Sequence, residues 1–230
     1  MLASTMTRLI AVSVLGSTAS GGGSAASSLA AVRLGDLHVT RGDIAEIAPG
    51  RLLVDGPKMR ATLAFMTDAE AALRFTYLGP TRSTAPLASG EIRRQLGLKL
   101  RAANTCNVVF VMWRLEPKNE VVVSVKSNPG STLHAQCGNR GYTNMKARWK
   151  APAPPVRPGV PHVLSARLSG EGLVASIDGQ PVWRGVVDAR AFAVDGPVGV
   201  RTDNVRIELE LAGGPRGAAV ADPGRGSDEP

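Results

Sequence analysis

The sequence predicts an all-β protein, a sandwich of two antiparallel sheets with about twelve strands. Runs of alternating apolar and polar residues recur from residue 34 to residue 211, and a period of two is typical of a half-buried strand. Glycine (26 residues) and proline (16 residues) are frequent between these runs, as expected of many short strands joined by turns. No stretch in this range has the apolar period of an amphipathic helix.

Both ends of the chain are expected to lie outside the sandwich, which we place at residues 31–212 as one domain. Residues 1–19 have the pattern of a signal peptide: a basic Arg8, an apolar stretch at 9–15 and small residues at 16–20. A chance apolar patch in a disordered N-terminus is the alternative. Residues 20–30 form a Gly- and Ser-rich flexible spacer, and residues 213–230 a disordered tail. We therefore expect a secreted protein, periplasmic or extracellular, without a membrane span.

The formal charge of +8 comes from 27 basic and 19 acidic residues. Such an excess favours an anionic partner such as nucleic acid, phospholipid head groups or an acidic polysaccharide. The alternative is a solvated basic surface without a dedicated partner. Nucleic acid ranks lower and is not expected, because an exported chain with few exposed aromatic residues lacks a stacking platform.

The first half of the sandwich is predicted from five strands. Residues 34–39 and 51–54 are expected to be short edge strands, followed by strands at 58–65 and 70–78 and a loop at 79–90. The fifth strand, residues 91–102, has an apolar and a basic face. Leu96, Leu98 and Leu100 alternate with the other set, which consists of Arg93, Gln95, Gly97, Lys99 and Arg101.

The central strand is predicted at residues 108–115, which are apolar on both faces until Arg114. Such a strand is covered on both sides and lies in the middle of a sheet. Residues 120–126 return as its hairpin partner. Shorter strands are expected at 133–137 and 144–149, before a proline-rich crossover at 151–161.

The last third continues the alternation. Strands are predicted at residues 161–168, 173–177 and 181–186, followed by a final pair at 196–201 and 205–211. The final pair is joined through Thr202, Asp203 and Asn204.

Two cysteines, Cys106 and Cys137, are present. In an exported protein an isolated pair is most simply one disulfide. It would fasten the polar segment from His134 to Tyr142 to the start of the central strand. A structural metal site is not expected, because histidines at ligand spacing are missing.

Three features resemble the concanavalin A-like lectin/glucanase and laminin-G superfamily of jelly-roll sandwiches. They are the stretch PHVLSARLSGEGLVASIDGQPVW, the stretch DGPVGVRTDNVRIELEL, and the number of strands. The resemblance implies a jelly-roll fold and a domain type that includes lectins, hydrolases, lyases and adhesion modules.

The favoured function is non-catalytic binding of carbohydrate, with acidic polysaccharide as a candidate ligand. Basic and polar residues of the strand at 91–102, of the central hairpin and of the turn after Cys137 would form the binding surface, and Trp149 would stack on sugar. The candidate ligand-binding residues are Arg93, Lys99, Arg101, Arg114, Ser124, Lys126, Asn139, Arg140, Tyr142 and Trp149. The alternative for residues 138–141 is a turn fastened by the disulfide, with Gly and Asn supplying positive φ. Trp113 is expected in the core, whereas Trp183 could lie in the core or on the surface.

Two alternatives remain open. A polyuronate lyase would neutralise the uronate carboxylate with Arg101 and Gln136 and move the C5 proton with His134 and Tyr142. Here the order is His-x-Gln, the reverse of the alginate-lyase pattern. A hydrolase is disfavoured, because Glu208 and Glu210 are expected to face solvent and the paired carboxylates of that chemistry are missing. The other alternative is a structural or adhesion module of the cell envelope.

No cofactor is expected. Calcium is the one alternative, with Asp195, Asp203 and Asn204 as scattered oxygen ligands. The protein is expected to be a monomer that binds carbohydrate.

Overall fold

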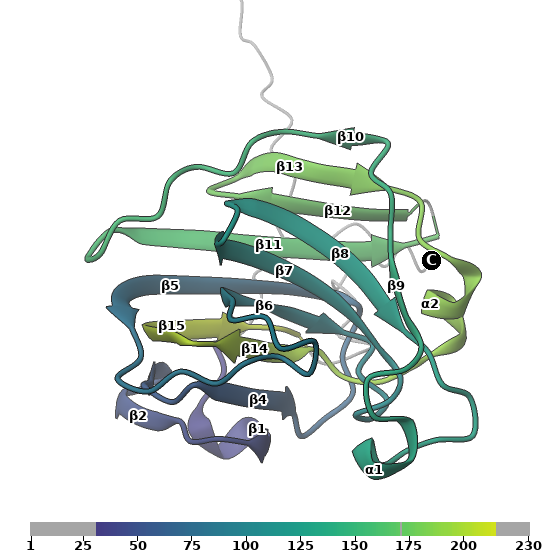
Figure 1. The fold of residues 1–230 in the computed structure, drawn as a ribbon, viewed down its shortest axis with the longest axis horizontal. Coiled ribbons are helices and arrows are strands. Elements are labelled where there is room, and N and C mark those ends of the chain that lie inside the picture. The colour runs from purple at the N-terminus through teal and green to yellow at the C-terminus, as the bar shows by residue number, and fades with distance from the viewer. Residues whose placement is uncertain (1–30, 171, 215–230) are drawn as a thin grey trace, which may run out of the picture.

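Alternating apolar residues build two β-sheets whose apolar faces pack against each other (Figure 1). The computed structural model describes residues 31–170 and 172–214. The predicted signal peptide, the spacer up to residue 30 and the tail from residue 215 lie outside these residues. All pairings between strands are antiparallel within this part of the chain. The predicted all-β sandwich is confirmed.

The sheet that carries the candidate site has seven strands. In spatial order they are β1 (Leu37–Arg41), β4 (Lys58–Leu63), β14 (Gly199–Asp203), β6 (Arg94–Leu100), β7 (Val108–Glu116), β8 (Glu120–Lys126) and β9 (Tyr142–Asn144).

The second sheet has eight strands. In spatial order they are β10 (Trp149–Lys150), β13 (Gln180–Gly185), β12 (Gly172–Ile177), β11 (Pro161–Ser169), β5 (Glu70–Pro80), β15 (Val205–Ala212), β3 (Arg51–Val54) and β2 (Ala45–Ala48). The short helices are η1 (Leu34–Asp36), α1 (His134–Cys137) and α2 (Ala189–Ala193). No described helix is long and apolar enough to cross a membrane.

The core lies between the two sheets. Leu96, Leu98 and Leu100 are fully buried in it, as their alternation along β6 predicts. Trp113 packs edge-to-face on Phe75, with 5.5 Å between ring centroids. Its indole Nε1 donates a hydrogen bond to Asn119 Oδ1. Trp113 is therefore a core residue, as expected, and so is Trp183.

The central strand β7 is apolar on both faces because each face has its own cluster. Val109, Val111 and Trp113 point into the main core. A separate cluster on the opposite face contains Ala102, Val108, Phe110 and Met112. The prediction that residues 108–115 are covered on both sides is confirmed.

Two predicted strands are wrong. The strand predicted at 133–137 is replaced by helix α1 at residues 134–137, and Gln136 Oε1 accepts hydrogen bonds from the backbone N–H groups of Thr132 and Leu133 before it. Residues 144–149 do not form one strand, because β9 ends at Asn144 and β10 begins at Trp149 in the other sheet.

Two further differences concern the end of β6 and the pairing of the last two strands. The strand predicted at 91–102 is shorter, since β6 ends at Leu100 and Arg101 has a left-handed φ of 49°. The predicted final pair does not pair: β14 and β15 belong to different sheets. Asn204 lies between them with φ of 55°, and the chain crosses from one sheet to the other there.

The predicted disulfide is confirmed. Cys106 and Cys137 are bonded, with 5.8 Å between their Cα atoms. The bridge fastens α1 to the segment that leads into β7. It therefore holds the chain between β8 and β9 at one end of the seven-stranded sheet.

Candidate functional site

The outer face of the seven-stranded sheet, here called the basic face, collects polar side chains from strands distant in sequence. Arg201 on β14 lies opposite Arg60 on β4. On the other side of β14, Asp203 lies opposite Gln95. Lys99, four residues further along β6, shares this face because side chains alternate along a strand. We call Arg60, Gln95, Lys99, Arg201 and Asp203 the central cluster.

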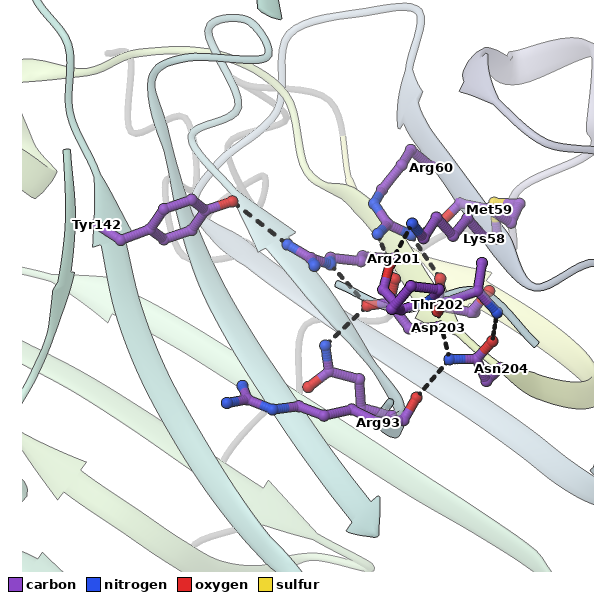
Figure 2. A network of polar contacts seen from close by, with 12 residues as sticks. Lys58, Met59, Arg60, Arg93, Tyr142, Arg201, Thr202, Asp203 and Asn204 are labelled. Atoms are coloured by element: carbon purple, nitrogen blue, oxygen red, sulfur yellow. Dashed lines mark hydrogen bonds and ion pairs between the residues drawn. The ribbon is translucent and has the colours of Figure 1, made fainter. Parts of the chain in front are cut away.

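Asp203 is the hub of the central cluster (Figure 2). Its carboxylate is fully buried and accepts hydrogen bonds from Arg60 Nη2, from Gln95 Nε2 at 2.7 Å and from Arg201 Nε at 3.0 Å. Burial alone would raise the pKa of Asp203, but Arg201 and Arg60 outweigh it and the pKa is lowered. Asp203 therefore stays ionised and orients both guanidinium groups.

The two arginines have further partners. Arg60 Nη1 donates to the carbonyl oxygens of Met59 and Thr202. Burial, together with the nearby Arg201, lowers the pKa of Arg60 to about 10. Arg201 Nη1 donates to Tyr142 Oη at 3.4 Å, as Figure 2 shows. Both guanidinium groups are thus held in place while carrying charge near neutral pH.

Lys99 differs from its neighbours because its ammonium makes no hydrogen bond or ion pair with any residue that the structure describes. The residue is only 6% exposed. Its burial, followed by the charges of Arg60 and Arg201, lowers its pKa to about 7. A buried amine without an acceptor is costly to keep charged.

An aromatic pair lies beside the central cluster. Tyr142 on β9 stacks on Phe110 of β7, with ring centroids 5.9 Å apart and planes 21° apart. Arg201 lies over the Phe110 ring and Lys126 over the Tyr142 ring, at 5.0 and 5.3 Å from the centroids. Tyr142 is 42% exposed, so it can offer a surface to a sugar ring.

Lys126 links this aromatic pair to the disulfide. Its ammonium donates to the carbonyl oxygens of Gly138 at 2.7 Å and Thr105 at 3.0 Å, and lies 3.2 Å from Cys137 Sγ. Burial and the charge of Arg201 lower the pKa of Lys126. Through these hydrogen bonds the Lys126 ammonium holds the segment around α1 in place.

The basic face brings together five of the predicted ligand-binding residues. On it lie Lys99, Arg114, Ser124, Lys126 and Tyr142. Arg114 pairs in register with Gln95 and has Glu120 as its ion-pair partner at 3.7 Å. Arg93 precedes β6 and pairs with Glu91.

Four predicted ligand-binding residues lie elsewhere. Arg101 donates to the carbonyl oxygen of Val194 at 2.5 Å and pairs with Asp195, because the turn after β6 carries it away. Asn139 and Arg140 are exposed in the turn after α1, where Arg140 Nη2 donates to Gln136 O. Trp149 is exposed on β10 of the other sheet, and the Arg184 guanidinium lies 5.8 Å from its ring centroid.

The four residues named for the lyase hypothesis make their contacts with different partners. Arg101 turns toward Val194, Gln136 holds the start of α1, and His134 is exposed on α1. Tyr142 joins Arg201 on the basic face. These contacts do not join the four side chains into one hydrogen-bonded group.

Sequence reasoning missed four members of the central cluster as ligand-binding residues. They are Arg60, Gln95, Arg201 and Asp203, of which Asp203 was named only as a calcium candidate. The sequence offered one indication, because Lys58, Arg60 and Thr62 alternate along β4 and therefore share its polar face. It does not reveal that β14, which is distant in sequence, lies between β4 and β6.

The residues named for calcium are occupied by other partners. Asp203 binds two guanidinium groups, and Asp195 pairs with Arg101 at 3.7 Å. Asn204 uses its side-chain amide to hold the backbone of Ala85 and Arg93. Within residues 31–170 and 172–214 there is no group of three or more His, Cys, Asp or Glu side chains placed to hold a metal ion.

No protein-family model matches the chain, and no curated protein matches its sequence. Solved structures do share the sandwich. Carbohydrate-binding module CBM66 from Bacillus subtilis aligns with a TM-score of 0.50 and 12% identity over 76% of this chain and 91% of that chain.

Two further structures are less similar. The metal-free carbohydrate recognition domain of Emp46p has a TM-score of 0.49 and 11% identity over 79% of this chain and 88% of its own. A putative glycosyl hydrolase from Parabacteroides distasonis has a TM-score of 0.46 and 10% identity over 78% and 94%. The similarity to CBM66, at 12% identity, shows the fold alone.

Proposed function

We propose that this chain is a secreted, monomeric, non-catalytic carbohydrate-binding sandwich that binds acidic polysaccharide on its basic face. One observation carries the proposal: the centre of that face holds four cations, the buried Lys99 and Lys126 and the largely buried Arg60 and Arg201, but a single buried carboxylate, Asp203. A buried excess of positive charge favours an anionic ligand.

The aromatic pair supports the carbohydrate part of the proposal. Tyr142 is half-exposed, rests on Phe110 and lies beside Arg201 and Lys126. A sugar ring stacked on Tyr142 would place a carboxylate within the positive field of these cations. The fold shared with a carbohydrate-binding module supports the same ligand class.

The test is binding of the full chain to polygalacturonate, alginate and hyaluronan, with neutral dextran as the comparison, by affinity electrophoresis and calorimetry. We expect retention on at least one acidic polymer, no retention on dextran, and weaker binding in high salt because the interaction is electrostatic. Equal retention on dextran, or none on any acidic polymer, would contradict the proposal.

A matched pair of variants locates the site. Tyr142→Ala should weaken polymer binding about tenfold or more, since a stacked ring contributes about 0.5–1.5 kcal/mol beyond the area that it buries. Trp149→Ala is the control, because Trp149 is similarly exposed at 48% but lies on the other sheet. Loss of binding in Trp149→Ala alone would move the site to the other sheet.

The same samples test catalysis. Accumulation of unsaturated product from polygalacturonate or alginate would favour the lyase hypothesis and overturn a purely binding role. Retention without product is the expected result.

A further inference from the structure

We propose that Lys99 anchors an anion subsite in the central cluster, which takes one carboxylate or sulfate group, and that binding there is coupled to uptake of a proton by its amine. The inference rests on the proposed function in one respect: the anionic group would belong to the polysaccharide. The subsite itself is argued from the charges of the cluster.

The first step is the charge balance of the basic face. Arg60 and Arg201 share Asp203, and Lys126 has its own carbonyl acceptors. Lys99 is the cation of this group that has no acceptor within the described chain. An unpaired buried ammonium is relieved either by losing its proton or by binding an anion.

The second step is access. Lys99 lies between Gly199 of β14 and Phe110 of β7, and neither neighbour offers a side-chain acceptor. Its Nζ retains contact with solvent, because the side-chain atoms that are sealed from solvent and lack a hydrogen bond in the described chain are others: Arg93 Nε, Arg114 Nε, His162 Nε2, Thr202 Oγ1 and Arg206 Nε. On this proposal a small anionic group reaches the amine from this solvent-exposed edge.

The third step is the coupling to pH. Burial and the neighbouring Arg60 and Arg201 bring the pKa of Lys99 to about 7. An anion beside the amine stabilises its charged form and raises this pKa, so by reciprocity the protonated amine binds the anion more tightly. Below about pH 7 the amine is already charged. Above it each bound anion brings in one proton, and affinity falls by up to about tenfold per pH unit.

The other charged groups around Lys99 are expected to change less. On β4 the pKa of Arg60 is lowered only to about 10, and on β14 Asp203 stays ionised. Arg201 on β14 has a raised pKa, because Asp203 and Tyr142 outweigh its burial. Lys126 on β8 has a lowered pKa but keeps its carbonyl acceptors, and Gln95 on β6 carries no charge.

The direct test is NMR of the full chain carrying ¹³C-labelled lysine, with sodium sulfate and sodium glucuronate as probes and chloride at matched ionic strength. Lys99 is assigned among the six lysines by its absence from Lys99→Met. We expect its titration midpoint near pH 7 to move up by a unit or more with sulfate or glucuronate. A midpoint that neither anion moves, or that chloride moves equally, overturns the subsite. The two probes separate sulfate from carboxylate preference.

The second test uses polygalacturonate at pH 6 and pH 8.5. Wild type should bind about tenfold or more weakly at pH 8.5, whereas Lys99→Met should bind equally at both pH values and no better than wild type at pH 8.5. Lys118→Met is the matched control, because the Lys118 side chain is 77% exposed and lies in the turn before β8. It should keep the pH dependence.

The two proposals fail in different ways. If the polymer binds but neither pH nor Lys99→Met matters, the proposed function stands and the subsite is wrong. If sulfate moves the Lys99 titration but no acidic polymer binds, the subsite stands and the proposed function is wrong. Retention of the full pH dependence in Lys99→Met also contradicts the subsite.

Discussion

At the scale of single residues, Asp203 and Lys99 are buried charges in opposite situations. Asp203 has three side-chain donors around its carboxylate, so its negative charge is compensated. Lys99 has two guanidinium groups nearby and no acceptor within the described residues. The same two arginines therefore stabilise the charged form of one residue and destabilise the charged form of the other.

This difference predicts how stability depends on pH. The unfolded chain binds a proton at Lys99 below about pH 10.5, whereas the folded chain binds it only below about pH 7. The unfolded state therefore holds more protons between these values, and the free energy of unfolding rises with pH there by up to about 1.4 kcal/mol per unit. The contribution is least favourable at and below pH 7.

Lys99→Met should remove that rise and be more stable than wild type at pH 7, because methionine fills a similar volume without charge. Urea unfolding at pH 6, 7, 8 and 9 measures the free energy of unfolding of both proteins. Lys118→Met is the control, and its free energy of unfolding should depend on pH as that of wild type does. Identical pH slopes for wild type and Lys99→Met would show that Lys99 is charged in the folded protein throughout.

At the scale of elements, Asn204 is the point where the chain leaves one sheet for the other. Its backbone is left-handed, with φ of 55°. Its side chain donates to the carbonyl oxygens of Ala85 and Arg93 and accepts from the N–H of Ala85. Asn204 thereby fixes the loop before β6 against the β14–β15 crossover, next to the hub Asp203.

We expect Asn204→Ala to destabilise the protein by about 2–4 kcal/mol, because it removes three hydrogen bonds and places alanine in a left-handed conformation. Asn204→Gly is the matched variant: it loses the same hydrogen bonds but tolerates the backbone, and should be about 1 kcal/mol less affected. Denaturant unfolding compares them. Equal loss in both variants would mean that the backbone conformation contributes nothing.

Helix α1 shows why one element could not be predicted. Residues 133–137 alternate for too few positions to separate a strand from a helix. What decides is tertiary: Gln136 accepts two backbone hydrogen bonds at the start of the turn, and Cys137 is tied to Cys106. By contrast, β6 and β8 are long and regular enough for their alternation to assign each face correctly.

At the scale of the whole molecule, the disulfide and Lys126 hold the α1 segment against the end of the seven-stranded sheet. The bridge closes a separation of 31 residues, and the Lys126 ammonium lies against Cys137 Sγ and two carbonyl groups. Tyr142 follows directly after this segment. We therefore expect the bridge to help position the aromatic pair.

Replacing both cysteines with serine should lower the free energy of unfolding by about 3–4 kcal/mol, because the unfolded chain regains the freedom of a loop of this length. Unfolding with and without reductant measures it, and the serine variant itself should be insensitive to reductant. A loss under about 1 kcal/mol would mean that contacts other than the bridge hold the segment.

The sequence by itself determined the all-β sandwich, the central position of β7, the disulfide, and the polar side of β6 with Lys99. Each of these follows from the local pattern of apolar residues or from a unique pair of cysteines. Only the tertiary structure decided that β14 lies between β4 and β6. This strand order brings Arg60, Arg201 and Asp203 onto the same sheet face as Lys99. Strand order depends on how distant segments bury their apolar sides together, and alternation within one strand carries no information about its neighbours.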